Sequence, residues 1–248
     1  MDGATVVITG AGSGIGRAIA RATAKHGAGP VVLLDLDEQG LQETARLLQQ
    51  SAPADRFRVD VTDSAAVETT FNQIRNRHGR IDFLFNSAGI QAGLPAWPEA
   101  SPERIRAVIE VNVLGVIFTT HSAISLMRDH GGSILNVASI SGLQPYLSGA
   151  IYGSSKAAVI HFTQCNKELA TQFGIRINAI CPSMVDTPFL RKTGEDGQIA
   201  PWLMDQIESG MVLTAEQVAD AAIRIACDET RAGEFEVITP NDDRQEGK

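Results

Sequence analysis

The sequence contains few of the residues that build disulfide scaffolds or catalytic thiols. Its 248 residues include three cysteines, Cys165, Cys181 and Cys227, and neither a CxxC spacing nor a Cys/His metal spacing occurs. The odd number of cysteines predicts buried free thiols in a reducing compartment. Because no neighbouring pattern would activate a thiol, we do not expect a cysteine nucleophile.

Metal-binding and hydrolase motifs are also missing. His121, His130 and His161 lack the spacing to acidic residues that metal sites show, and the sequence contains no HExxH motif. A GxSxG nucleophile motif is absent as well. We therefore predict no metal site and no serine-hydrolase chemistry.

Positive charge and long apolar runs are scarce. The 29 acidic residues outnumber the 21 lysines and arginines, which gives a net charge of −8 without a basic cluster. An acidic surface disfavours binding to nucleic acid and to anionic lipid. We find no signal peptide and no apolar stretch that we expect to span a membrane. We therefore expect a soluble cytoplasmic protein with no nucleic-acid or membrane partner.

Short apolar runs alternate with longer helical patterns. The predicted strands are Thr5–Thr9, Val31–Asp35, Arg56–Asp60, Phe83–Asn86, Ser133–Val137, Arg176–Cys181 and Glu234–Ile238. The predicted helices are Ile15–His26, Leu41–Gln50, Ala65–Arg77, Pro102–Met127, Tyr152–Phe173 and Ala215–Cys227, several of them after a capping residue such as Thr62 or Ser64, Ser101 and Thr214. Strands that are apolar throughout are typical of parallel sheets covered on both faces. The pattern predicts an α/β fold: one domain, residues 1–248, with a doubly wound, mostly parallel seven-stranded sheet and helices on both faces.

The segment Thr187–Met211 breaks this alternation. Its prolines and glycines predict a long excursion with one or two short helices. Apolar residues such as Phe189 and Trp202 favour a substrate lid at 187–211, because a fully solvated loop rarely carries so much apolar area. A poorly ordered surface loop is the alternative.

A glycine-rich turn follows the first predicted strand and precedes the first helix. It reads Thr9-Gly-Ala-Gly-Ser-Gly-Ile-Gly16. A dinucleotide pyrophosphate needs such a turn, in which glycine lets the backbone approach and the helix N-terminus faces the phosphates. The setting favours a Rossmann-type cofactor site over a plain connection. Its binding residues would be Gly10, Ser13, Gly14, Ile15 and Gly16.

Asp35 ends the second predicted strand, 19 residues after Gly16. A carboxylate there can accept both hydroxyls of an adenosine ribose and would repel a 2′-phosphate, so NAD is favoured over NADP. Ser13 and Leu36, near the expected 2′ position, offer no cation to a phosphate. Arg17 begins the helix and is expected to make structural contacts. The alternative for Asp35 is that it caps the next helix.

Tyr152 and Lys156 are four residues apart on a predicted helix, which places them on one face. An ammonium and the positive nicotinamide of NAD⁺ would lower the pKa of the phenol toward neutrality. Such a tyrosine can remove an alcohol proton while hydride leaves carbon, and can return it to a ketone. Ser139 follows a strand at its carboxyl end, where its hydroxyl can donate to the substrate oxygen, with Ser141 as its competitor. A surface pair is the alternative for Tyr152 and Lys156.

Taken together, these motifs resemble the short-chain dehydrogenases/reductases. The resemblance runs from Thr5 to about Thr187 and rests on Thr9–Gly16, Asp60-Val61, Asn86-Ser-Ala-Gly89, Asn112, Ser139 and Tyr152-Gly-Ser-Ser-Lys156. It implies catalytic roles for Asn112, Ser139, Tyr152 and Lys156. The spacing from Ser139 to Tyr152 matches the family and selects Ser139 over Ser141.

The resemblance also implies how a nicotinamide cofactor is held. Asp60 and Val61 would flank the adenine, and Asn86, Ala88 and Gly89 would shape the strand end beside the cofactor. Lys156 would hold the nicotinamide ribose, and Asn112 would hold a water that links Lys156 to bulk solvent. Contacts from Ile15 and from the loop after Cys181 would complete the site, with Pro182, Val185 and Thr187 nearest the nicotinamide.

Three features differ from the usual family pattern. Ser87 stands where a second asparagine is common, and Ser183 stands where glycine is common. The C-terminal Glu234-Phe-Glu-Val-Ile-Thr-Pro240 lacks the usual Asp-Gly-Gly and is similar to the hydroxyprostaglandin dehydrogenase branch. This ending is a hint toward a lipophilic secondary alcohol, and it leaves a homodimer or a homotetramer as the expected assembly.

The expected substrate pocket is mainly apolar. Its predicted lining is Gln91, Leu94, Ser141, Gln144, Tyr146, Leu147, Met184, Phe189 and Trp202. The sequence therefore predicts an NAD-dependent oxidoreductase that interconverts a neutral, moderately hydrophobic secondary alcohol and its ketone. An NADP(H)-dependent carbonyl reductase and a non-catalytic nucleotide-sensing protein of the same fold are the alternatives.

Overall fold

Seven parallel strands form the centre of the molecule. The structure, a computed structural model, describes residues 1–191 and 201–240, except the side chains of 191, 201–203 and 206. The sheet has the order β3-β2-β1-β4-β5-β6-β9. Its strands are β1 Val6–Thr9, β2 Val31–Asp35, β3 Ala54–Arg58, β4 Phe83–Asn86, β5 Gly132–Val137, β6 Ile175–Pro182 and β9 Phe235–Ile238. The strand order reverses on the two sides of β1, so a switch point lies between β1 and β4, where doubly wound folds bind ligands.

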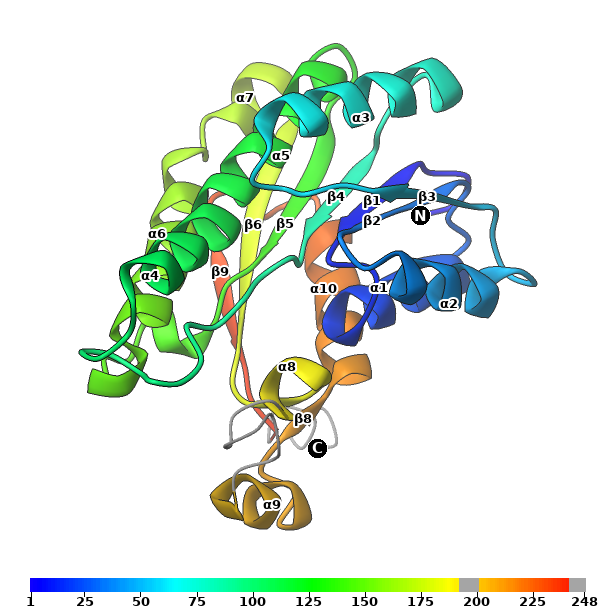
Figure 1. Cartoon of the computed structure of the whole chain (residues 1–248). Helices are drawn as coiled ribbons and strands as arrows, with labels where there is room; N and C mark the ends of the chain where they lie inside the picture. The colour runs from blue at the N-terminus through cyan, green and yellow to red at the C-terminus, as the bar shows by residue number, and fades with distance from the viewer. Residues whose placement is uncertain (192–200, 241–248) are drawn as a thin grey trace, which may run out of the picture.

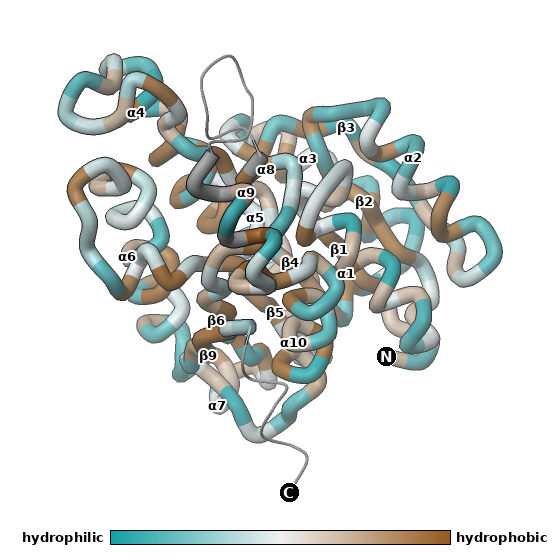
Figure 2. Tube along the Cα trace, turned by 90° about the horizontal axis from the view of Figure 1, so that it is seen from below, coloured by the Kyte–Doolittle hydropathy of each residue, from teal (hydrophilic) through white to brown (hydrophobic). Residues whose placement is uncertain are grey.

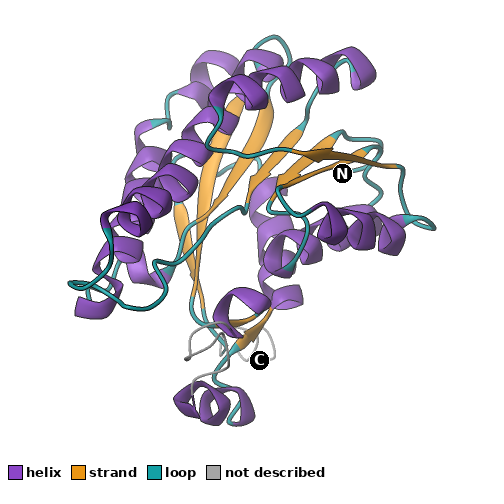
Figure 3. Cartoon of the chain, in the orientation of Figure 1, coloured by secondary structure: helices purple, strands orange, loops and turns teal. Residues whose placement is uncertain are grey.

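Helices cover both faces of this sheet, as Figures 1 and 3 show. On one face lie α1 Gly14–Lys25, α2 Glu38–Leu48 and α10 Ala215–Cys227. On the other lie α3 Ser64–His78, α4 Pro102–Ile109, α5 Gly115–Met127, α6 Ala150–Cys165 and α7 Leu169–Phe173. The predicted α/β fold with a doubly wound parallel sheet is confirmed.

Each face of the sheet has its own buried core. Ile8, Leu33 and Ile19 belong to the cluster shared with α1, α2 and α10. Val7 and Phe71 belong to the cluster shared with α3 and α5. In Figure 2 the brown, hydrophobic positions accordingly lie along the central strands. Alternate strand residues point to opposite faces, which is why apolar residues occur in continuous runs.

Some predicted boundaries were wrong. Strand β3 is Ala54–Arg58 rather than Arg56–Asp60, because its register with β2 ends where Asp35 pairs with Arg58. The predicted helix Tyr152–Phe173 is two helices, α6 and α7, and α6 starts two residues earlier. Helix α3 is capped by Asp63, whose carboxylate accepts two backbone N–H groups, rather than by Thr62 or Ser64.

The predicted helix Pro102–Met127 is helical over its whole length, but it is not a single regular α-helix. A π-helical turn at Glu110–Leu114 joins α4 to α5. The run has 26 residues with a mean hydropathy of 1.5 in its most apolar window, so by length and composition it could span a membrane, contrary to our expectation. Within this protein 39% of that window is buried, and α5 packs against α3 and the sheet.

The excursion after β6 lies beyond the carboxyl ends of the strands, where Figure 1 shows α8 and α9. It starts with β7 Val185–Asp186, which pairs in parallel with β8 Leu213–Thr214, a pairing the sequence did not predict. One or two short helices were expected here, and two are present, α8 Pro188–Arg191 and α9 Pro201–Glu208. Residues 192–200 of the predicted lid lie outside the described residues.

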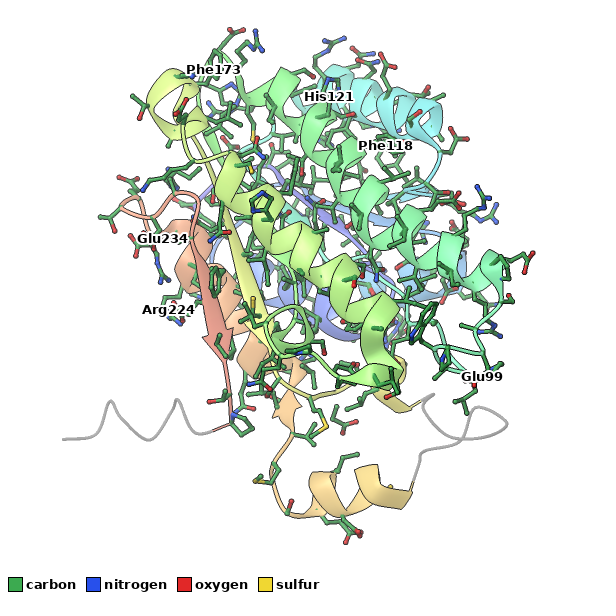
Figure 4. All side chains as sticks on the ribbon, turned by 90° about the vertical axis from the view of Figure 1, so that its left-hand side faces the viewer. Glu99, Phe118, His121, Phe173, Arg224 and Glu234 are labelled. Atoms are coloured by element: carbon green, nitrogen blue, oxygen red, sulfur yellow. The ribbon has the colours of Figure 1, made fainter. Side chains whose placement is uncertain are left out.

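Strand β9 is the edge of the sheet beyond β6, and charged side chains line it. Arg224 of α10 and Arg231 both pair with Glu236, and Arg231 also pairs with Glu234 at 3.1 Å. Figure 4 labels Arg224 and Glu234 at this edge, and Phe118 and His121 on α5. Charged side chains on an edge strand discourage pairing with other chains.

Candidate active site

The glycine turn packs directly against the end of β4. Gly10 has φ +66°, and a Cβ there would lie 2.8 Å from the Ala88 nitrogen. A Cβ at Gly16 would lie 2.1 Å from the Gly10 oxygen, so neither position accepts a side chain. Thr9 Oγ1 accepts hydrogen bonds from the backbone nitrogens of Ser87 (3.1 Å) and Ala88 (3.2 Å). These contacts hold β1 and β4 together at the switch point.

The N-terminus of α1 faces the segment that follows β6. Ser13 is the N-cap of α1, yet its side chain makes no capping hydrogen bond. A Cβ at Gly14, which has φ +49°, would lie 3.3 Å from Thr187 Cβ. The first N–H groups of α1 and buried Thr187 therefore lie close together. This is the geometry that an anionic pyrophosphate needs.

Asp35 folds back over the glycine turn. Its Oδ2 accepts from the Gly12 nitrogen at 2.8 Å and its Oδ1 accepts from the Asp37 nitrogen at 2.9 Å. Each carboxylate oxygen keeps a second lone pair for a ligand hydroxyl. The cap of α2 is Asp37 rather than Asp35. Leu36 is exposed beside it.

Arg17 makes structural contacts, as predicted. Its guanidinium donates to the Gly12 oxygen and, at 3.0 Å, to Thr44 Oγ1. Thr44 in turn donates to the Ala11 oxygen at 2.8 Å. These hydrogen bonds fix the backbone of the turn. They also engage the guanidinium of Arg17, which is the cation nearest to the turn.

Asp60 and Val61 follow β3 at the same end of the sheet. Asp60 is exposed, and its Oδ1 accepts from the Thr62 nitrogen at 2.9 Å. Val61 is buried against the first turn of α5, where a Cβ at Gly115 would lie 2.7 Å from it. The two residues are thus held in a tight turn at the carboxyl end of the sheet.

The Asn86 side chain points into the protein interior rather than toward the glycine turn. It donates to Thr120 Oγ1 (3.0 Å) and Asn136 Oδ1 (2.9 Å), and it accepts from Thr119 Oγ1 (2.7 Å). All four side chains are buried. Asn86 therefore fixes β4 against α5 and β5, and what adjoins the turn is the backbone of the next two residues.

Asn112 lies in the π-helical turn and is fully buried. Its side chain accepts from the Ile90 nitrogen at 2.8 Å and donates to the Ile90 oxygen at 2.9 Å and to Ser155 Oγ at 3.0 Å. A Cβ at Gly89 would lie 3.4 Å from Asn112 Oδ1 and 3.5 Å from Lys156 Nζ. The structure therefore brings Gly89, Asn112 and Lys156 together.

Lys156 is almost fully buried and donates to the Val137 oxygen at 2.8 Å. Its Nζ lies 5.7 Å from the centroid of the Tyr152 ring. Burial lowers the pKa of Lys156 to about 8. The ammonium thus lies beside the Tyr152 ring, and its own charge is lost at mildly alkaline pH.

Tyr152, which is partly buried, and Ser139, which is buried, form the centre of the site. The Ser139 side chain lies close enough to the phenol to affect its pKa, and Ser139 Oγ accepts from the Ser141 nitrogen at 3.1 Å. The expected lowering of the Tyr152 pKa is wrong for the protein alone. Burial raises this pKa above its ordinary value, the Ser139 side chain offsets part of the rise, and Tyr146 adds to it. Burial disfavours the phenolate, and the residue sequence alone does not reveal that burial.

The 3₁₀ turn Ile140–Gly142 is pressed against α6 and sets the distance between Ser139 and Tyr152. A Cβ at Gly142 would lie 2.8 Å from the Ala157 nitrogen, and a Cβ at Gly153 would lie 2.7 Å from the Ser141 oxygen. These two glycines allow the close approach. The spacing of Ser139 and Tyr152 in the sequence indicates that the two residues form a pair, but it does not reveal this packing of the turn against α6.

The predicted pocket residues are only partly gathered around Tyr152. Among them, Phe189 packs beside Tyr152, and the centroids of the two rings are 5.8 Å apart. Tyr146 lies near Ser141, while Gln91, Leu94, Gln144 and Leu147 are exposed and Met184 is half-buried. Trp202 lies in α9, but its side chain is outside the described residues.

Sequence reasoning missed Thr9, Ser155 and Cys181. Thr9 and Ser155 position the glycine turn and Asn112, and only their places beside known motifs could have indicated them. Cys181 is the buried thiol of the three; Cys165 and Cys227 are exposed, contrary to our expectation. Burial raises the pKa of Cys181 to about 11, so the thiol beside Lys156 stays neutral.

The site fits a nicotinamide dinucleotide. Ser183, in the loop expected to face the nicotinamide, has a buried hydroxyl without a hydrogen-bond partner, and the glycine turn excludes side chains where a pyrophosphate would lie. Among the described residues, no group of three or more His, Cys, Asp and Glu side chains could hold a metal ion.

Comparison with known proteins agrees with this geometry. The family model described as short chain dehydrogenase matches residues 4–198. The chain belongs to the short chain dehydrogenase family. A meso-2,3-butanediol dehydrogenase of Serratia marcescens is 34% identical over 228 residues, which cover 92% of this chain and 89% of that protein. A 15-hydroxyprostaglandin dehydrogenase (NAD(+)) of Mus musculus is 31% identical over 254 residues, covering 96% and 91%.

The fold of this dehydrogenase is also found in solved structures. Levodione reductase superimposes with a TM-score of 0.89 at 26% identity, over 99% of each chain. The relatives are oxidoreductases that act on CH–OH groups, and some depend on NAD. This short chain dehydrogenase is therefore an oxidoreductase with a nicotinamide cofactor.

Proposed function

We propose that this short chain dehydrogenase interconverts a secondary alcohol and its ketone with NAD, and that Tyr152 is the acid/base. The observation that carries the proposal is the juxtaposition of three residues: Ser139 is buried beside the Tyr152 phenol, and Lys156 Nζ lies 5.7 Å from the centroid of the Tyr152 ring. All three lie at the carboxyl end of the sheet, beside the glycine turn.

Tyr152 and Ser139 would act on the same substrate oxygen. When bound, NAD⁺ supplies the hydride acceptor and a positive charge that opposes the effect of burial on the phenol. Tyr152 takes the proton of the alcohol at its phenol oxygen, and Ser139 donates a hydrogen bond to the developing ketone oxygen. In the reverse direction Tyr152 returns the proton. Lys156 favours the phenolate by its charge.

The cofactor would lie across the switch point. The turn residues Gly10, Ser13, Gly14, Ile15 and Gly16 would hold the pyrophosphate at the N-terminus of α1. Asp35 would accept the ribose hydroxyls and repel a 2′-phosphate, with Leu36 offering no cation. The remaining contacts would come from Asp60, Val61, Asn86, Ala88, Gly89, Pro182, Val185 and Thr187, with Asn86 acting only through its backbone.

The hydrogen bonds of Asn112 restrict where a water could bind in a relay from Lys156 to solvent. Both donors of the Asn112 amide are used by Ile90 and Ser155. A bridging water would therefore bind the second lone pair of Asn112 Oδ1 or the Asn112 backbone carbonyl. Gly89, which adjoins both Oδ1 and Lys156 Nζ, leaves space for that path.

The substrate side is proposed to be neutral and mostly apolar. Phe189 packs beside Tyr152 and starts the segment that we propose as a substrate lid at 187–211. The likeness to a hydroxyprostaglandin dehydrogenase and a butanediol dehydrogenase supports a secondary alcohol. A homodimer or homotetramer in the cytoplasm stays a prediction, which light scattering and cell fractionation would check.

The direct test is a panel of secondary alcohols with either NAD⁺ or NADP⁺, in which formation of the reduced cofactor is followed by absorbance. We expect turnover of neutral alcohols with NAD⁺ and a much smaller rate with NADP⁺. A preference for charged sugars or hydroxy acids would contradict the proposed pocket. Binding of NAD⁺ without turnover of any alcohol or ketone would favour a nucleotide-sensing protein, and a preference for NADP(H) would favour a carbonyl reductase.

A further inference from the structure

A second pair of hydroxyls lies beside the Ser139–Tyr152 pair. Ser141 Oγ and the phenol oxygen of Tyr146 are 3.4 Å apart. Ser141 lies in the 3₁₀ turn that follows Ser139, and its nitrogen donates to Ser139 Oγ at 3.1 Å, while Tyr146 precedes the 3₁₀ turn Leu147–Gly149 that leads into α6. Ser139 is buried and Tyr152 is partly buried, whereas Tyr146 is 49% exposed. A more exposed pair of hydroxyls thus lies beside the inner pair at the N-terminal end of α6.

Gly149 explains why the Tyr146 phenol lies there. A Cβ at Gly149 would lie 1.9 Å from Tyr146 Cζ and 2.2 Å from the phenol oxygen. Any side chain at Gly149 would displace the ring. Gly149 is the N-cap of α6 and stands three residues before Tyr152, about one helical turn away. The Tyr146 oxygen is therefore held over the first turn of the helix that carries the proposed acid/base.

The influence of Tyr146 on Tyr152 agrees with this proximity. A charge on the Tyr146 phenol raises the pKa of the Tyr152 phenol. The outer pair consists of two neutral hydroxyls, each of which can donate and accept a hydrogen bond. Such a pair can bind a hydroxyl or carbonyl oxygen, but it provides no positive charge for a carboxylate or a phosphate.

We propose that Ser141 and Tyr146 bind a second oxygen of the substrate, on the carbon next to the reacting one. This inference rests on the proposed function and narrows its substrate class to vicinal diols and the corresponding hydroxy ketones. Ser139 and Tyr152 hold the reacting oxygen, and the outer pair holds its neighbour. A substrate with a single oxygen leaves the outer pair without a partner.

The test compares two alcohols on the same ring: cyclohexanol and the vicinal cyclohexanediol. In the wild type we expect a higher kcat/KM for the diol. Tyr146→Phe removes one hydroxyl and should reduce the diol-to-cyclohexanol ratio of kcat/KM about tenfold, the size expected for one hydrogen bond. Gly149→Ala, which displaces the Tyr146 ring, should reduce the ratio similarly. Ser148→Ala, an exposed hydroxyl of the same loop, is the matched control and should leave the ratio unchanged.

A binding measurement separates this inference from the proposed chemistry. Calorimetry of each alcohol with Tyr152→Phe in saturating NAD⁺ reports affinity without turnover. Tighter binding of the diol, lost when Tyr146→Phe is added, would support the outer pair even if the acid/base assignment failed. Equal affinities for the two alcohols, or a preference that survives Tyr146→Phe, would overturn the inference and leave the proposed reaction intact.

Discussion

At the scale of single residues, the environment of each titratable group decides its role. Tyr152 shows this most clearly, because burial raises its pKa while the sequence pattern predicts the opposite. The prediction considered only the charges of Lys156 and NAD⁺. Burial of the phenol depends on the packing of the turn Ile140–Gly142 against α6, which no spacing rule contains. The sequence predicts which residue is the acid/base but not the pKa of that residue in the protein alone.

We expect the carboxylate of Asp35 to cause a preference for NAD over NADP. A substitution of similar shape can test the effect of its charge alone. Asp35→Asn removes the negative charge but keeps one oxygen that can accept from Gly12. Because a like charge near a 2′-phosphate costs at least about 1 kcal/mol, we expect the NADP⁺-to-NAD⁺ ratio of kcat/KM to rise about fivefold or more. Steady-state kinetics with both cofactors measure this ratio.

Asp35→Ala is the companion variant. It removes the charge and also both hydrogen bonds to the backbone, so the same change in ratio should come with weaker binding of both cofactors. An unaltered ratio in Asp35→Asn would show that the carboxylate is not what excludes NADP.

At the scale of secondary-structure elements, the π-helical turn between α4 and α5 was the main feature that the sequence did not reveal. The apolar periodicity of Pro102–Met127 is that of one helix, and the irregular turn depends on Asn112 reaching Ile90 and Ser155. Strands β2 and β4 have the predicted bounds because their apolar runs end at polar residues, Asp35 and Asn86. Strand β3 contains three charged residues among its five and lacks a continuous apolar run, and its predicted bounds were displaced by two positions.

Replacing Asn112 should loosen this turn. In Asn112→Leu the nitrogen and oxygen of Ile90 lose their partners, and each unsatisfied buried group costs about 1–3 kcal/mol. We therefore expect the free energy of unfolding in urea to fall by about 2–5 kcal/mol. Turnover should fall as well, because Gly89 and Lys156 adjoin Asn112.

Asn76→Leu on the exposed face of α3 is the control for this experiment. It should change the unfolding free energy by no more than about 0.5 kcal/mol. If Asn112→Leu were as stable as this control, the hydrogen bonds to Ile90 would not support the turn.

At the scale of the whole molecule, the buried Lys156 should lower stability at neutral pH. The pKa of Lys156 in the folded protein is about 8, below its ordinary value of 10.5. Between these pH values the unfolded chain binds a proton that the folded protein does not, so the free energy of unfolding rises with pH. The cost of the buried ammonium is fully present below pH 8 and disappears above the unfolded pKa. Its size is on the order of 3 kcal/mol.

Lys156→Met removes this dependence. We expect the wild type to gain stability relative to Lys156→Met as pH rises from about 8 to about 10.5. Urea unfolding of both proteins across this range measures the difference. Parallel stability curves would mean that the ammonium is not desolvated in the folded protein.

The account as a whole depends on Tyr152 as the acid/base. The most direct measurement is kcat of Tyr152→Phe on an alcohol that the wild type oxidises, together with its affinity for NAD⁺. Phenylalanine keeps the ring beside Phe189 and removes only the oxygen, so we predict wild-type affinity for NAD⁺ and a fall in kcat of at least about 100-fold, the lower end of the contribution of a positioned acid/base. A Tyr152→Phe enzyme that keeps its turnover would contradict the mechanism.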